Sequence, residues 1–273
     1  MIEPLVEAIR DRQAMLFVGA GVSRALGLPS WEELIGEMAV ELGYDPDVFA
    51  KNGGYLVLAE YYELQKATLG PLRSWMDRKW HTDESKVDAS SVHKAIVDLE
   101  FPIIYTTNYD RWLEIAHQRR GKAFTKIANV GDFTKIRDGT TQIVKLHGDF
   151  DEDHSLVLTE TSYFDRLSFE SPLDIKLRSD AIGKAILFLG YSLSDINVRY
   201  LLYKLHRLWA DSAFAAAQPR SFVFMPRPNP VQQAILARRG ITPIVSELDD
   251  SGAGLQDFLE KLVHDVSDVA PAS

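Results

Sequence analysis

Short apolar runs alternate with helical patterns along this chain, and most of these runs end directly in glycine or polar residues. Runs of this length, bounded by turn residues and separated by helices, are typical of buried parallel strands. We therefore expect an α/β fold, a Rossmann-like, doubly wound parallel β-sheet with helices on both faces. The expected strands are residues 14–18, 102–105, 143–146, 186–189 and 222–225.

The helix that follows the first strand has the clearest boundaries. Ser30 and Glu33 form the S-x-x-E pattern of a capping box, and an apolar series at helical spacing runs from Trp31 to Leu42 before Gly43. Similar periodicity predicts further helices over residues 3–13, 91–99, 198–209 and 255–266, with Ser194 as a plausible N-cap for the third of these.

Residues 44–90 show helical spacing and no strand pattern. We expect a single domain spanning residues 1–273, with a helical insertion at about 44–90. The aromatic residues of the insertion suit the core of a small subdomain better than the lining of a ligand pocket, because aromatic side chains dominate ordinary cores. The polar stretches 128–141 and 149–172 are expected to be surface loops.

Composition excludes several classes of function. The 273 residues carry a net charge of −9, which argues against direct nucleic-acid binding over the whole surface. The chain has no cysteine, so disulfides, thiol nucleophiles and Cys-ligated zinc are excluded, and the seven histidines lack metal-ligand spacing. It has neither an apolar run of transmembrane length nor a signal-peptide pattern, so we expect a cytoplasmic protein with no membrane contact.

Glycine or polar clusters follow four of the expected strands. In an open parallel sheet, ligands bind outside the carboxyl ends of the strands, so these clusters are expected to converge on one crevice. The clusters are Gly19-Ala20-Gly21, Thr107-Asn108-Tyr109-Asp110, His147-Gly148-Asp149 and Gly190-Tyr191-Ser192.

Each polar residue also has a purely structural interpretation. Asn108 suits an Asx turn, and Asp110 or Ser192 suits a helix cap. For Asn108 and Asp110 the two interpretations stay open. His147 favours function because it stands between a strand and a glycine, and histidine is the side chain best suited to act as a base near neutral pH.

The set of residue types favours dinucleotide chemistry. The chain has no serine nucleophile elbow, no metal cluster and no Walker lysine. The remaining groups are a glycine turn, an amide, a carboxylate and an imidazole. Together they suit the binding of a dinucleotide and the activation of a ribose hydroxyl or a water. Arg24 replaces the third glycine of the GxGxxG fingerprint, which argues against a dehydrogenase. Arg24 either faces the crevice and clamps a diphosphate or is an exposed loop residue.

Taken together and in order, these segments resemble the sirtuin motifs, most closely those of the sirtuin-like branch found in bacterial anti-phage defence. The matching segments are GAGVS at 19–23, GLP at 27–29, TTNYD at 106–110, KLHGD at 145–149 and GYSLSD at 190–195.

The resemblance implies roles for individual residues. Asn108 would help to place a water by the nicotinamide ribose, Asp110 would contact the nicotinamide carboxamide, and His147 would be the general base. The candidate NAD-binding residues are Gly19, Ala20, Gly21, Ser23, Arg24, Thr107, Gly190 and Ser192.

The resemblance also implies an activity and partners. Defence-type sirtuin relatives hydrolyse NAD to nicotinamide and ADP-ribose, commonly as oligomers and often with a HerA-type ATPase or an Argonaute-like protein. The four-cysteine zinc module of sirtuin deacetylases is absent, so we expect no metal, and Ser30-Trp31 replaces a Phe-Arg pair near the nicotinamide. An NAD-dependent protein deacylase and a non-catalytic NAD or ADP-ribose sensor are the alternatives.

Overall fold

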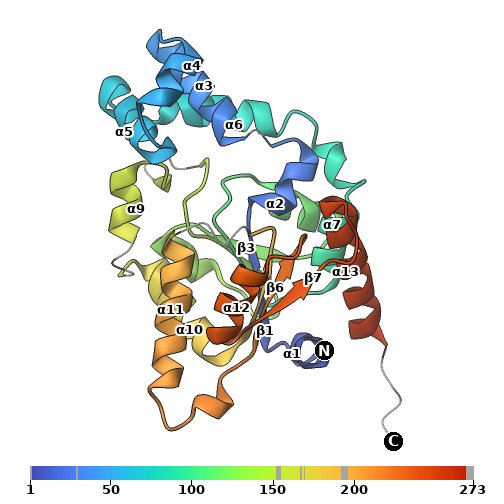
Figure 1. Ribbon diagram of the computed structural model, residues 1–273. Coiled ribbons are helices and arrows are strands. Elements are labelled where there is room, and N and C mark those ends of the chain that lie inside the picture. Colours follow the sequence, from blue (N-terminus) through green and yellow to red (C-terminus); the bar gives the residue numbers. More distant parts are fainter. Residues whose placement is uncertain are drawn as a thin grey trace, which may run out of the picture.

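The computed structural model describes residues 2–28, 30–151, 155–166, 168, 170–191 and 196–268. Within these ranges a seven-stranded sheet has the order β3-β4-β2-β1-β5-β6-β7, with every neighbouring pair parallel (Figure 1). The predicted Rossmann-like fold is confirmed. The strands are β1 (Ala14–Val18), β2 (Ile103–Thr106), β3 (Phe124–Ile127), β4 (Thr141–Lys145), β5 (Ala185–Leu189), β6 (Ser221–Met225) and β7 (Ile241–Val245).

Strand β1 lies at the centre of the sheet, where the strand order reverses direction. Leu16 pairs with Ile104 of β2 on one side and with Leu187 of β5 on the other. All residues of β1 and β5 are buried, as expected for strands covered on both faces. The carboxyl ends of β1, β2 and β5 therefore meet at the topological switch point, where such sheets bind ligands.

The sequence interpretation missed β3 and β7, which are the two edge strands of the sheet. Strand β3 alternates half-buried with buried residues and carries Lys126, while in β7 only Ile241 is buried and Pro243 interrupts the apolar pattern. Lysine and proline protect a free edge from pairing with another chain. The same residues weaken the apolar signal by which a strand is recognised in sequence.

Helices cover both faces of the sheet (Figure 1). On one face α1 (Glu3–Arg10), α7 (Ser91–Asp98) and α13 (Ser251–Ser267) bury Leu5, Ile96 and Phe258 against the strands. On the other face α10 (Pro172–Gly183), α11 (Ile196–Ala210) and α12 (Pro230–Arg238) bury Leu177, Leu205 and Leu236 in a second core.

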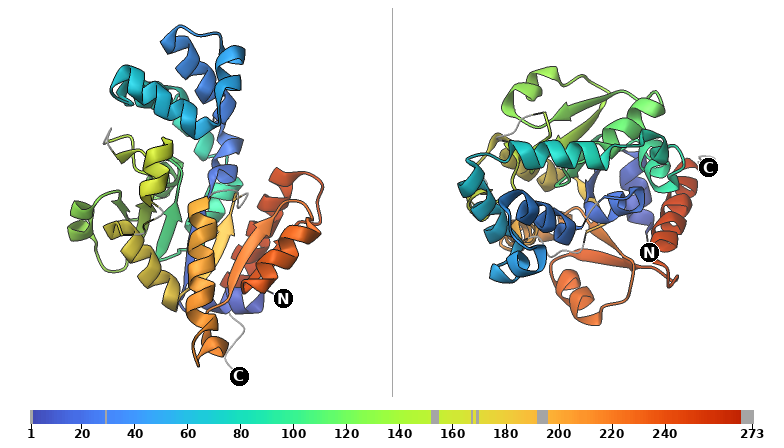
Figure 2. Two further views of the ribbon diagram at one scale, coloured as in Figure 1. Left: turned by 60° about the vertical axis from the view of Figure 1, so that its left-hand side comes forward. Right: turned by 90° about the horizontal axis from the view of Figure 1, so that it is seen from above.

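Four helices between β1 and β2 form a lobe, residues 31–80, that projects beyond the sheet (Figure 2). Its first helix begins with the predicted capping box, in which Ser30 N donates to Glu33 Oε2 at 2.7 Å and Glu33 N donates to Ser30 Oγ at 3.2 Å. Tyr62 and Trp80 are buried in the core of this lobe, as expected for core aromatics. The helices are α3 (Trp31–Leu42), α4 (Pro46–Phe49), α5 (Tyr55–Lys66) and α6 (Gly70–Trp80).

The stretches expected to be loops contain regular structure. Residues 130–135 form the 3-10 helix η4 (Val130–Lys135), and α9 (Glu160–Arg166) lies within 149–172. Helix α9 buries no residue completely, so it lacks the apolar stripe that reveals a helix in sequence. The remaining short elements are α2 (Ala20–Ser23), η1 (Arg24–Leu26), η2 (Ala50–Asn52), η3 (Glu84–Val87), α8 (Trp112–Arg119) and η6 (Ala215–Ala217).

Candidate active site

The glycine turn after β1 packs backbone to backbone against the turn after β5. Gly19 N donates to Leu189 O at 2.8 Å, and Gly21 N donates to Gly190 O at 2.9 Å. A Cβ on Gly190, which has a φ of +65°, would lie 2.5 Å from Val22 N. Close packing of the two turns therefore requires glycine at these positions, and the Gly19 and Gly21 amides are satisfied within the protein.

Thr107 and Tyr191 join the loops after β2 and β5 across the end of β1. Their hydroxyl oxygens are 2.8 Å apart. The Tyr191 ring meets the edge of the Phe17 ring with centroids 5.4 Å apart, and a Cβ on Gly19 would lie 2.5 Å from Tyr191 Cδ2. The structure thus brings three of the four predicted clusters together at the switch point.

Asn108 is buried and bonds to the glycine turn after β1. Its backbone N donates to Thr106 Oγ1 at 3.0 Å, and its side-chain Nδ2 donates to Ser23 Oγ at 3.2 Å. The side chain therefore contacts a residue distant in sequence rather than capping the turn that follows it. Ser23 is itself buried, so the pair lies beneath the outer edge formed by the exposed Ala20 and Gly21.

Asp110 has one oxygen with a structural task and one without a partner. Its Oδ1 accepts from Trp112 N at 3.1 Å, a turn bond directly before α8, whose N-cap residue is Arg111. Its Oδ2 is buried and accepts no hydrogen bond from the described residues. Burial raises the pKa of Asp110, while the Lys145 ammonium opposes that rise. A side-chain hydrogen bond from Ser23 also lowers the pKa of Asp110, so this carboxylate is linked to the glycine turn after β1.

His147 is buried on the turn after β4. Its ring meets Tyr163 of α9 edge to face, with centroids 5.1 Å apart. Burial, with the positive charge of Arg166, lowers the pKa of His147 to about 3, so the imidazole is neutral at physiological pH. The turn requires Gly148, which has a φ of +88°, because a Cβ there would lie 2.1 Å from Ser155 O.

Lys145 is a member of this site that the sequence interpretation missed. It ends β4 with no exposed surface, and its Nζ donates to Asp110 O at 2.7 Å, Tyr109 O at 3.0 Å and Glu114 Oε1 at 3.2 Å. A lysine at the end of a buried strand, two positions before His147, is the signal that identifies it. Through Lys145 the cluster after β4 joins the cluster after β2.

The remaining predicted site residues differ in how exposed they are, and not all of them lie in the described ranges. Thr107 is half-buried, and Arg24 is exposed on η1. Ser192, with the proposed cap Ser194, lies outside the described residues. Across the ranges that the structure describes, no three His, Asp or Glu side chains are grouped closely enough to hold a metal ion, and no helix is long and apolar enough to cross a membrane.

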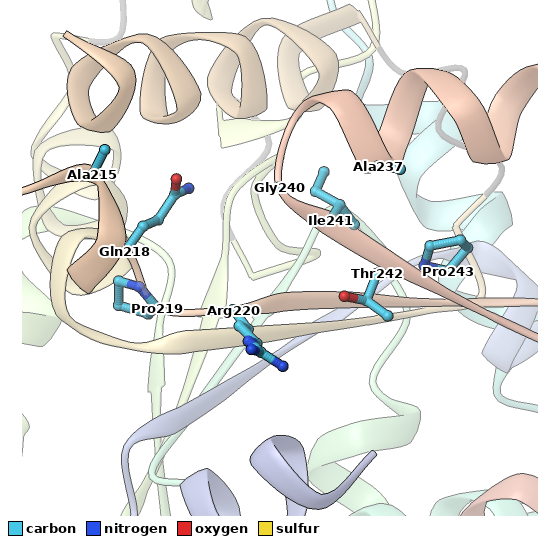
Figure 3. Close-up of a pocket in the computed structure, with 9 residues that line it drawn as sticks. All are labelled: Ala215, Gln218, Pro219, Arg220, Ala237, Gly240, Ile241, Thr242 and Pro243. Carbon is cyan, nitrogen blue, oxygen red and sulfur yellow. The ribbon is translucent and has the colours of Figure 1, made fainter. Parts of the chain in front are cut away.

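A hollow of about 440 Å³ lies at the opposite end of the sheet (Figure 3). Residues at the beginnings of β6 and β7 line this hollow. They include Gln218, Arg220, Gly240 and Thr242. None of the predicted site residues lines it, so the candidate active site rests on the polar groups at the carboxyl ends of the strands.

A family profile described as the SIR2-like domain matches residues 102–244, more than half of the chain. The chain belongs to the SIR2-like family. The match to this SIR2-like domain runs from just before β2 into β7 and includes Asn108, His147 and Gly190.

Curated relatives of this SIR2-like chain include an NAD(+) hydrolase ThsA from Acinetobacter baumannii, 28% identical over 208 residues, covering 75% of this chain and 42% of that protein. Defense-associated sirtuin 2 of Bacillus subtilis is 28% identical over 272 residues, covering 95% of this chain and 26% of that protein. The chain thus spans less than half the length of these relatives. A solved Sir2 enzyme aligns over 97% of this chain and 96% of its own, with a TM-score of 0.46 and 15% identity.

Proposed function

We propose that this chain hydrolyses NAD at the bond between nicotinamide and ribose, giving nicotinamide and ADP-ribose. The contact between Asn108 and Ser23, together with a neutral buried His147 on the turn after the neighbouring strand β4, is the observation that carries the proposal. These residues supply an amide and a base at the carboxyl ends of two adjacent strands. The names of the curated NAD(+) hydrolase relatives support the same activity.

In the proposed reaction water attacks C1′ of the nicotinamide ribose as the C–N bond breaks. Nicotinamide leaves as a neutral molecule and therefore needs no acid. Asn108 orients the ribose and the water, and His147 accepts the proton that the water loses. The carboxyl group of Asp110 pairs with the carboxamide of nicotinamide in this proposal.

The diphosphate and riboses lie along the turns after β1 and β5 in this proposal. The exposed Ala20 and Arg24 and the half-buried Thr107 would hold them, together with the residues at 190 and 192. We also propose that residues 1–273 act as one domain with a helical insertion at about 44–90. The resemblance to defence-type sirtuins supports the rest of the proposal. The chain would act in the cytoplasm as an oligomer, with a HerA-type ATPase or an Argonaute-like protein as its partner. It would deplete NAD and would need no metal.

The test follows nicotinamide and ADP-ribose after the purified chain is mixed with NAD, with and without an acyl-lysine peptide. We expect release of both products without peptide. Asn108→Ala and His147→Ala are expected to lower the rate about 10²–10⁴-fold. His264→Ala, an exposed residue of α13, is the matched control and keeps the wild-type rate. Nicotinamide release that strictly requires the peptide would replace hydrolysis by deacylation, and wild-type rates in both site variants would refute the mechanism.

A further inference from the structure

Among the described residues, Lys145 is the one lysine or arginine that is completely buried. We propose that Lys145 is the positioning residue of the candidate active site, fixing the loop after β2 against the turn after β4. The proposal rests on the proposed function for its kinetic consequences. Its structural consequences stand on the contacts of the ammonium group alone.

The ammonium group of Lys145 has every donor occupied. An ammonium offers three N–H groups. They meet three oxygens, the backbone carbonyls of Tyr109 and Asp110 and the side chain of Glu114. Two of these acceptors are consecutive carbonyls of the loop that carries Asn108. Their common donor fixes the orientation of both peptide groups.

The charges around Lys145 explain why a cation is buried there. Asp149 Oδ2 lies 3.5 Å and Glu114 Oε1 lies 3.2 Å from its Nζ. The second oxygen of Glu114 and Oδ2 of Asp110 are buried without a partner in the described part of the chain. A buried charge is costly unless it is paired, so Glu114 in particular depends on the ammonium group of Lys145.

Position along the chain gives Lys145 its role in the proposed reaction. Lys145 stands two residues before His147, and its Nζ donates to the carbonyl oxygen of Tyr109, the residue after Asn108. Lys145 therefore links the loop that carries the amide to the strand that carries the base, in addition to the bonds of Asn108 to Thr106 and Ser23. A displacement of about 1 Å at a reacting group costs about 10²-fold in rate.

The experiment separates positioning from charge balance. Lys145→Met keeps an unbranched apolar side chain as far as Cε, removes the ammonium group and leaves Glu114 without its cation. Adding Glu114→Gln removes that buried charge but restores no bond to the two carbonyls. Asp149 keeps a second cation in both variants, because Lys126 Nζ lies 3.0 Å from its Oδ2. Lys261→Met, which removes an exposed ion pair with Asp257, is the matched control.

For Lys145→Met we expect kcat for NAD to fall about 10²-fold while KM changes less, together with a lower urea midpoint. The double variant should regain much of the urea midpoint but not kcat, and amide hydrogen exchange of residues 107–111 should stay faster than in the wild type. Recovery of kcat together with stability in the double variant would overturn the proposal, because Lys145 would then only balance charge.

The two proposals can fail separately. If the wild-type chain releases no nicotinamide, the proposed function fails and the exchange measurement still tests Lys145. Faster exchange confined to residues 107–111 in the double variant would then support positioning. Wild-type exchange rates in that loop would overturn it.

Discussion

The side-chain nitrogen of Asn108 lies 3.2 Å from the hydroxyl oxygen of Ser23, a residue 85 positions earlier in the chain. Both side chains are buried. The contact joins the loop after β2 to the glycine turn after β1. Two motifs that are separate in the sequence therefore form one structural unit.

This contact predicts coupled kinetic effects. Ser23→Ala removes the acceptor of the Asn108 amide, and a hydrogen bond between neutral groups contributes about 0.5–1.5 kcal/mol. We expect turnover of NAD to fall about 3- to 10-fold for Ser23→Ala. In a double-mutant cycle, Ser23→Ala should have little further effect in an Asn108→Ala background. Additive effects of the two substitutions on kcat would show that the residues act independently.

Alanine substitutions at Gly190, which directly follows β5, and at Gly121 should differ in how much they lower the free energy of unfolding. Gly190 and Gly121 have φ values of +65° and +63°, but a Cβ on Gly190 would lie 2.5 Å from Val22 N, whereas one on Gly121 would meet nothing within 4 Å. Gly121→Ala should lower the free energy of unfolding by about 1 kcal/mol, the cost of the left-handed conformation. Gly190→Ala should cost clearly more in the same urea titration. Equal losses would mean that the two turns can separate freely.

Two buried histidines predict a loss of stability in mild acid. Burial lowers the pKa of His93 to about 4 and, with Arg166, that of His147 to about 3. Below about pH 6.5 the unfolded chain binds protons that the native chain does not. The free energy of unfolding should therefore fall between pH 6.5 and 5, by about 1.4 kcal/mol per pH unit for each histidine.

Urea unfolding at pH 7.5, 6 and 5 measures this slope. His93→Gln should reduce it, and His264→Gln, at an exposed position, should leave it unchanged. A slope that is the same in His93→Gln as in the wild type would show that His93 titrates normally.

The hydrogen bonds of Glu60 indicate that α5 of the helical lobe holds α9 in place against His147. Glu60 Oε2 accepts from Thr161 N at 2.9 Å and its Oε1 accepts from Thr161 Oγ1 at 2.8 Å, which ties α5 to the first turn of α9. Because Tyr163 of α9 packs on His147, Glu60→Gln should speed amide exchange in residues 160–166 and lower turnover of NAD. Glu63→Gln, on the same helix, is the matched control. Unchanged exchange in Glu60→Gln would show that α9 is held by its other contacts.

Much of the fold could be predicted from the sequence because the central strands are buried on both faces. Their apolar runs are continuous, and the capping box at Ser30 and Glu33 marks a helix start through purely local bonds. The edge strands β3 and β7 and the helix α9 could not be predicted in this way, because their residues are half-exposed and polar. Convergence of the clusters could be predicted because parallel strands place their carboxyl ends at one edge.

The sequence by itself determined the parallel sheet, the glycine turns and the order of the motifs, since these follow from local periodicity and backbone chemistry. Only the tertiary structure decided what each polar group contacts. It paired Asn108 with Ser23, assigned one oxygen of Asp110 to the turn before α8, and buried Lys145 among oxygens from three segments. Those contacts join residues distant in sequence, and a buried charge finds its partners only when the chain has folded around it.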